Sequence, residues 1–379
     1  QMNISRRLLL SSAVFSPFVV RASSTLAASP AKIGLFVPLS GFAAPSGAEI
    51  RDAVTLFVKE KNAAGGVLGA PIDLIVADDA GKPEEAVNIA RRFATRDDVL
   101  VAVGSVTSPT SLAAAQVFRE AQIPQVVVTS TAQRITTQGN EWIFRSAAPD
   151  TKLVADLVDF IVTKSPNLKR FALLYVNDDF GKGGIDNFKA AGEARGLTIV
   201  AEERIATGDL DFSGQLTRIR DAKPDALLDW TRYTEASLIA RQLQQLNMGS
   251  LPHFGSDSFA VPKYIELSGA AANGVMYPSP FSSAVSTQIP AAQTLEQKLK
   301  AAYGKPTSYN HVQGWDAIYI AVDAIARAGK PDRTAIRDAM RVTKFDSARG
   351  AFSFDKKGDP TFETAIIRVV DQKETNARL

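Results

Sequence analysis

Ten serine and threonine side chains lie in the first half of the chain where short apolar runs give way to helical patterns. In an open α/β sheet, ligands bind beyond the carboxyl ends of the strands, where helix N-termini offer free N–H groups to an anion. Ser108 before Pro109 fits a helix N-cap, and it fits equally well a helix start that receives a ligand carboxylate. The ten residues are Ser40, Ser46, Ser105, Thr107, Ser108, Thr110, Ser111, Thr129, Ser130 and Thr131.

Catalytic motifs are missing from the sequence. No Gly-x-Gly-x-x-Gly follows a strand pattern, and no Gly-Lys pair is followed by Ser or Thr, which disfavours nucleotide binding. The Gly-x-Ser-x-Gly nucleophile elbow of a hydrolase is absent, and the two histidines, His253 and His311, lack short metal-ligand spacing. We interpret Asp78-Asp79 as acceptors for the following loop rather than as an acid–base pair. The sequence therefore predicts binding without catalysis, with neither a metal nor a cofactor.

The elements that must position these residues alternate along the chain. From residue 32, short β-rich runs and longer amphipathic segments follow one another, which indicates βαβ units and parallel sheets. A first series has strands near 33–37, 72–77, 100–103 and 125–128 and helices near 47–62, 83–95 and 110–121. A second has strands near 171–176, 197–202, 226–229 and 274–278, a short one before Gly255, and helices near 151–164, 183–194, 212–222 and 235–246. Helices near 291–303, 309–327 and 333–340 and a closing strand pair, 352–354 with 366–370, complete the pattern.

The N-terminus has the composition of an export signal. Ser5-Arg6-Arg7 precedes an apolar run over 8–20 and a small-residue stretch over 22–28, which predicts a signal peptide at 1–28 that is cleaved near Ala28. The paired arginines resemble a twin-arginine signal, and a Sec signal is the alternative. The apolar run is shorter than the ~20 residues that a spanning helix needs. We therefore expect a periplasmic protein.

Composition and charge fit a soluble two-domain protein. A chain of 379 residues is longer than the roughly 250 to 300 residues at which single cores stop growing. Without Arg6, Arg7 and Arg21 of the signal, basic and acidic residues are equal in number, and no basic stripe suggests nucleic acid. The absence of cysteine excludes disulfides, thiolate metal sites and a lipid anchor on Cys. We expect a monomer without nucleic-acid partners.

Short motifs along the whole mature chain match a known family. They are Ile33-Gly34, 38–41, 61–66, 78–80 with Pro83 and Ala86, 104–111, 129–131 with Ile135-Thr136, Phe144-Arg145 and 178–183. Through them the chain resembles the branched-chain amino-acid (Leu/Ile/Val) binding proteins, the type I periplasmic solute-binding components of ABC transporters. The resemblance implies an α/β fold with two Rossmann-like lobes, each with a parallel central sheet, joined by a three-strand hinge. It places 31–148 and 277–349 in lobe 1, and 149–276 and 350–379 in lobe 2.

The resemblance also implies where a ligand binds. Ser108 and Thr131 stand at the positions that hold an amino-acid carboxylate, and Thr129 stands where a backbone carbonyl meets the ammonium. Asp257 corresponds to the acidic partner of that ammonium. Phe180, with Trp230 and Tyr233, is expected to supply apolar walls.

Three of the positions depart from the family pattern. Phe180 replaces a tyrosine, Ser46 an aromatic residue and Arg232 another tyrosine. If Arg232 faces the cleft, it could bind a second carboxylate in a bidentate manner or neutralise Asp257; otherwise it is a solvated charge at the cleft rim.

The resemblance implies a function as well as a site. We expect the solute-binding component of an ABC transporter, with a permease in the inner membrane as partner and closure of two lobes around a small amino acid or related carboxylate. The alternatives are an aromatic or dicarboxylic acid, or an amide or urea-type solute, as ligand. A ligand-sensing receptor domain and an exported α/β hydrolase are the other classes.

Overall fold

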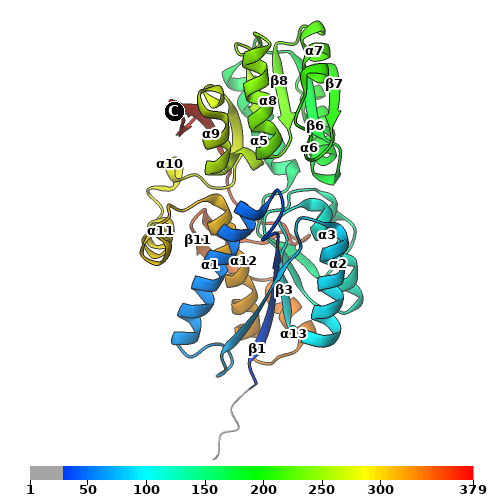
Figure 1. Cartoon of the computed structure of the whole chain (residues 1–379). Helices are drawn as coiled ribbons and strands as arrows, with labels where there is room; N and C mark the ends of the chain where they lie inside the picture. The colour runs from blue at the N-terminus through cyan, green and yellow to red at the C-terminus, as the bar shows by residue number, and fades with distance from the viewer. Residues whose placement is uncertain (1–28, 379) are drawn as a thin grey trace, which may run out of the picture.

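The computed structural model describes residues 29–378, which form two α/β lobes stacked end to end (Figure 1). The predicted signal peptide at 1–28 lies outside the described residues. The expected α/β class with parallel-dominated sheets is confirmed.

The sheet of the first lobe is entirely parallel, with the strand order β2-β1-β3-β4-β5. Buried Val and Ile residues fill these strands because helices cover both faces. Ile50 and Val54 of one helix and Ile318 of a later helix pack on one face, and Ala86 and Phe118 pack on the other. The strands are β1 (Ala31–Val37), β2 (Ile72–Asp78), β3 (Val101–Val103), β4 (Gln125–Val127) and β5 (Ile143–Arg145). The helices are α1 (Ala44–Ala63), α2 (Pro83–Arg92), α3 (Ser108–Glu120), α4 (Arg134–Thr137), α12 (Tyr309–Ala328) and α13 (Arg333–Met340).

The sheet of the second lobe has seven strands in the order β14-β13-β10-β9-β8-β6-β7. Its five strands from β10 to β7 are parallel, and β13 and β14 add an antiparallel edge. The strands are β6 (Arg170–Val176), β7 (Thr198–Ile205), β8 (Ala226–Trp230), β9 (His253–Gly255), β10 (Met276–Ser279), β13 (Ala365–Val370) and β14 (Lys373–Asn376). The helices are α5 (Asp150–Lys164), α6 (Asp179–Glu193), α7 (Ser213–Asp221), α8 (Tyr233–Gln245) and α9 (Pro262–Ser268).

The predicted closing strand pair was wrong in its pairing. β12 (Gly350–Ser353) pairs with β11 (Lys344–Ser347) as a separate hairpin, whereas β13 pairs with β10 and β14. The hairpin stays with the first lobe because Phe352 is buried in that core, while Ile366 is buried in the core of the second lobe. The apolar runs of β12 and β13, which are close in sequence, therefore belong to different sheets and different lobes.

Three segments of chain connect the lobes. The first leads from β5 to α5, the second from β10 through α10 (Ser283–Ser286) to α11 (Pro290–Tyr303), and the third from β12 to β13. Arg349 ties this region together because its Nη1 donates to the carbonyl of Ser146 at 2.8 Å and its Nη2 pairs with buried Asp316 at 2.5 Å. We propose that the lobe boundaries follow the strand pairing, which places 277–279 with the second sheet and 350–353 with the first lobe.

Candidate ligand-binding site

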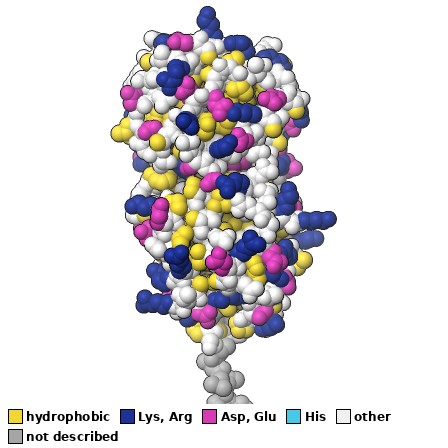
Figure 2. All heavy atoms as spheres, turned by 90° about the vertical axis from the view of Figure 1, so that its right-hand side faces the viewer, with side chains coloured by type: hydrophobic (Ala, Val, Ile, Leu, Met, Phe, Trp, Pro, Cys, Tyr) yellow, Lys and Arg dark blue, Asp and Glu magenta, His cyan; other side chains and the backbone are white. Residues whose placement is uncertain are grey.

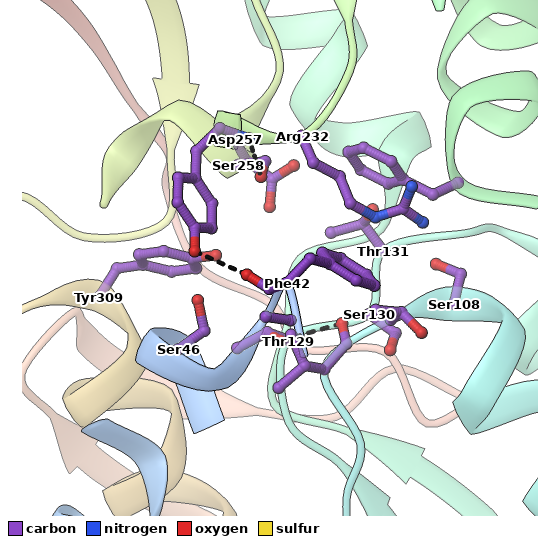
Figure 3. Close-up of a pocket in the computed structure, with 15 residues that line it drawn as sticks. Phe42, Ser46, Ser108, Thr129, Ser130, Thr131, Arg232, Asp257, Ser258 and Tyr309 are labelled. Atoms are coloured by element: carbon purple, nitrogen blue, oxygen red, sulfur yellow. Dashed lines mark hydrogen bonds between the residues drawn. The ribbon is translucent and has the colours of Figure 1, made fainter. Parts of the chain in front are cut away.

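One pocket, with about 460 Å³ of space not occupied by atoms, lies between the two lobes (Figure 3). All seven residues predicted to bind a ligand line it, although they come from loops and helix starts spread over both lobes. These are Ser46, Ser108, Thr129, Thr131, Phe180, Arg232 and Asp257. Eight more residues complete the lining: Phe42, Ala43, Val106, Thr107, Ser130, Tyr233, Ser258 and Tyr309.

The start of α3 forms one end of the pocket. Thr107, and not Ser108, is the N-cap of this helix: its Oγ1 accepts a hydrogen bond from the N–H of Thr110 at 3.4 Å. Ser108 is the first helical residue, and its Oγ accepts from the N–H of Ala132 at 3.2 Å. A hydroxyl that accepts keeps its own proton to donate. Ser108 can therefore donate to an anion at a helix N-terminus, where the helix dipole already favours negative charge.

Thr131 is held in place by its backbone. Its carbonyl accepts hydrogen bonds from Arg145 Nη1 at 3.0 Å and from the N–H of Asp150 at 2.9 Å. Its Oγ1 is buried and has no hydrogen-bond partner among the described residues. Arg145 is fully buried, and its Nε is fixed by Asp359. The arginine thus positions Thr131 beside Ser108, and the threonine hydroxyl lies near the carboxyl of Asp150 without a hydrogen bond of ordinary length.

Asp257 lies on the second-lobe side of the pocket, in a 3₁₀ turn that follows β9. Its side chain is buried, and its Oδ1 has no hydrogen-bond partner within residues 29–378. Burial raises the pKa of this carboxyl well above its ordinary value, and the neighbouring Asp150 raises the pKa further. An uncompensated buried carboxylate costs several kcal/mol, so without a cation the group favours its neutral form.

Arg232 faces the pocket, and its charge is already paired. The guanidinium forms an ion pair with Asp178 and donates to Thr207 Oγ1 at 3.1 Å, both in the second lobe. It also lies between two aromatic rings, 5.4 Å from the centroid of Phe42 and 5.5 Å from that of Phe180. Arg232 is therefore a wall of the pocket that also contacts the first lobe through Phe42.

The aromatic walls differ in one respect from the expectation. Phe180 and Tyr233 line the pocket, but Trp230 does not: it is fully buried behind Phe180, with ring centroids 6.3 Å apart. Trp230 ends β8 and points into the core of its lobe, where it supports Phe180. Tyr233 crosses the cleft instead, because its hydroxyl donates to the carbonyl of Phe42 at 2.9 Å.

Asp150, Phe42 and Tyr309 were missed by the sequence reasoning. Asp150 is completely buried beside the pocket, neither carboxyl oxygen has a partner in the described chain, and burial raises its pKa to about 7. Asp150 did carry a signal, because it follows Pro149 at a helix start. In the sequence, Phe42 looks like an ordinary loop residue and Tyr309 like an ordinary first residue of a helix. Only the fold brings the two together at the pocket.

Other candidate groups serve the structure. Asp78 Oδ1 accepts from the N–H groups of Leu39 and Ala80, as expected for a carboxylate at a strand end. His253 lies 3.2 Å from buried Asp229, and His311 forms a capping box with Ser308 at the start of α12. Within residues 29–378, no group of three His, Asp or Glu side chains is placed to hold a metal ion.

The comparison with known proteins decides the family. A family model described as "Periplasmic binding protein" matches residues 30–374. A Leu/Ile/Val-binding protein of Rhizobium johnstonii is 30% identical over 90% of this chain and 92% of its own. The chain belongs to the Leu/Ile/Val-binding family of type I periplasmic binding proteins.

Solved structures agree with this assignment. A leucine-binding protein from Thermotoga maritima has a TM-score of 0.85 and 28% identity, and the similarity covers 91% of this chain and 97% of the other. A solute-binding protein of an ABC transporter from Rhodopseudomonas palustris, in complex with 3,4-dihydroxybenzoic acid, has a TM-score of 0.82 and 26% identity over 91% and 95% of the two chains. The binding protein is thus a periplasmic component of the kind that serves ABC transporters. Across residues 29–378, no helix is long and apolar enough to cross a membrane.

Proposed function

We propose that the protein captures a small α-amino monocarboxylic acid between its lobes and delivers it to an ABC permease in the inner membrane. The observation that carries the proposal is the pairing of two kinds of free group in one pocket. Hydroxyl donors lie at the start of α3, and the partnerless oxygen of Asp257 faces them from the other lobe.

The carboxylate of the ligand would bind to Ser108, Thr131 and the N-terminus of α3. Both hydroxyl groups can donate, and both are almost completely buried. Hydrogen bonds to a charged group contribute about 1.5 to 3 kcal/mol each. A carboxylate here would satisfy the threonine hydroxyl, which has no partner in the described chain.

The amino end rests on Asp257. A ligand ammonium would favour the ionised form of this carboxyl and compensate its buried charge. Thr129 also lines the pocket, and its hydroxyl donates to the carbonyl of Val106 at 3.2 Å. By the family pattern, the Thr129 carbonyl would accept a hydrogen bond from the ammonium. The ligand therefore bridges the lobes and stabilises the closed form.

Arg232 supports a monocarboxylic rather than a dicarboxylic ligand. A second ligand carboxylate would have to compete with Asp178 for the guanidinium. Losing that partner would leave Asp178 uncompensated near the pocket, so the ion pair disfavours dicarboxylic acids.

An aromatic carboxylic acid is the second candidate. The rings of Phe42, Phe180, Tyr233 and Tyr309 surround the pocket, and the Rhodopseudomonas palustris relative is in complex with a dihydroxybenzoic acid. Such a ligand would use the same carboxylate end and leave Asp257 neutral.

The test is calorimetry on protein stripped of bound ligand by unfolding and refolding. The panel contains apolar and hydroxylated amino acids, benzoate and hydroxybenzoates, and dicarboxylic acids. We expect an amino acid to bind tightest, and Ser108→Ala to weaken it about tenfold or more, while the exposed Ser250→Ala leaves affinity unchanged. Binding of benzoates alone would replace the amino-acid proposal by the second candidate, and failure of every carboxylate would overturn both.

A further inference from the structure

Ser46 and Tyr309 present two hydroxyl groups to the pocket at the end opposite Ser108 (Figure 3). Ser46 comes from the first turn of α1, and Tyr309 is the first residue of α12. Both side chains are at least nine-tenths buried, with exposures of 5% and 6%. Within residues 29–378 neither hydroxyl takes part in a hydrogen bond, whereas the hydroxyl of Tyr233 nearby donates to the carbonyl of Phe42, and neither oxygen is among the buried atoms closed off without a partner.

Hydroxyl groups that line a pocket and make no hydrogen bond to the protein remain able to bond to whatever occupies the pocket. Two such groups at one end of a binding pocket therefore indicate a polar occupant there. A wall designed only for a hydrocarbon side chain has no use for either hydroxyl.

The two acidic neighbours of this end have other partners, one within the protein and one proposed in the ligand. Glu49 accepts hydrogen bonds from Ser308 Oγ at 2.7 Å and from Asn310 Nδ2 at 2.8 Å, which leaves it turned toward the start of α12. Asp257 is the other acidic neighbour of Tyr309, and it is assigned above to the amino group of the ligand. The remaining groups at this end are neutral hydroxyls that can both donate and accept.

We propose that Ser46 and Tyr309 form a subsite for a neutral hydrogen-bonding group, above all a hydroxyl, at the end of the ligand remote from its carboxylate. The substrate class is then a hydroxylated carboxylic acid rather than one with a plain hydrocarbon chain. This inference rests on the proposed function, because it takes the carboxylate end at Ser108 and Thr131 as fixed.

The experiment compares ligands that differ in one hydroxyl. The stripped protein is titrated calorimetrically with homoserine against 2-aminobutyrate, tyrosine against phenylalanine, and 4-hydroxybenzoate against benzoate, since each pair differs in a hydroxyl at the end remote from the carboxylate. In the pair that fits the pocket, we expect the hydroxylated member to bind about tenfold tighter or more, because a site with unpaired polar groups rejects the analogue that lacks their partner. Equal affinities within every binding pair would show that water fills the subsite and would overturn the inference. Failure of all six carboxylates would instead contradict the proposed function.

Two conservative variants assign the preference to these residues. Ser46→Ala and Tyr309→Phe should each reduce the advantage of the hydroxylated ligand to a few-fold or less while leaving the affinity for its partner nearly unchanged. Tyr303→Phe is the matched control, because Tyr303 bonds to the carbonyl of Asp52 outside the pocket. Thermal melting of each variant verifies folding. An undiminished preference in both folded pocket variants would contradict the assignment.

Discussion

Two buried carboxyl groups, Asp150 and Asp257, lie at or beside the pocket. Burial is the largest cause that raises the pKa of each carboxyl, and the charge of Asp150 raises the pKa of Asp257 further. Arg145 is the cation that opposes the shift of Asp150. The seven predicted residues came from the family pattern, which carries the positions that contact a ligand. Asp150 was not among them; it does not line the pocket, and its N–H donates to the carbonyl of Thr131 from behind.

At this position we expect the substitution Asp150→Asn to change the pH dependence of stability. The folded-state pKa of about 7 lies above the ordinary value of 3.8, so ionising Asp150 costs folding free energy as pH rises through this window. The variant should gain stability over the wild type between pH 5 and pH 8, by about 2 kcal/mol.

Chemical denaturation at pH 5 and pH 8 measures this difference. The exposed Asp346→Asn serves as control and should show no such trend. A stability difference between Asp150→Asn and wild type that is the same at both pH values would contradict the assigned burial cost.

The sequence predicted the presence of most helices and strands, but it predicted less well where each begins and which strands pair. Continuous apolar runs marked the parallel strands because both faces of each sheet are covered. The run at 350–353 gave no hint that it pairs with 344–347, since pairing depends on which core receives Phe352. The N-cap of α3 was misplaced by one residue because Thr107 and Ser108 are both good N-cap residues, and the helix begins two residues before the predicted start at 110.

Substitution of glycines in α6 tests how closely this helix packs against Trp230 of β8. A Cβ added at Gly184 would come within 2.1 Å of Nε1 of buried Trp230, whereas at Gly192 of the same helix it would make an ordinary 3.4 Å contact with Leu197. We expect Gly184→Ala to destabilise the protein by about 1 to 3 kcal/mol, and Gly192→Ala to be neutral or stabilising by up to about 1 kcal/mol. Urea denaturation of both variants decides this; equal effects would show that α6 can move away from Trp230.

Within residues 29–378, side chains make polar contacts across the cleft between the two lobes. Tyr233 bonds to the carbonyl of Phe42, and Arg134 pairs with Asp179 at 2.5 Å. Figure 2 shows acidic and basic side chains interspersed over one face of both lobes, which fits the similar numbers of basic and acidic residues in the chain, 43 and 40. The sequence could predict the lobes, but it could not predict these contacts because they depend on how the lobes meet.

The contact of Tyr233 should contribute to ligand affinity through the closed form. Removing one neutral hydrogen bond in Tyr233→Phe costs about 0.5 to 1.5 kcal/mol, so we expect roughly two- to tenfold weaker binding. Tyr303→Phe removes the same kind of bond within one lobe and should leave affinity unchanged. Calorimetry with the tightest ligand of the panel measures both; equal affinities would mean that closure does not depend on this bond.

The central claim is that the cleft between the lobes recognises a ligand through its carboxylate. The most direct test is calorimetric titration of the wild-type protein with the tightest acid of the panel and with the primary amide of the same acid. We predict that the amide binds about a hundredfold more weakly or worse, because the hydroxyls of Ser108 and Thr131 and the N-terminus of α3 all favour a charged acceptor. Equal affinity for acid and amide would contradict the claim.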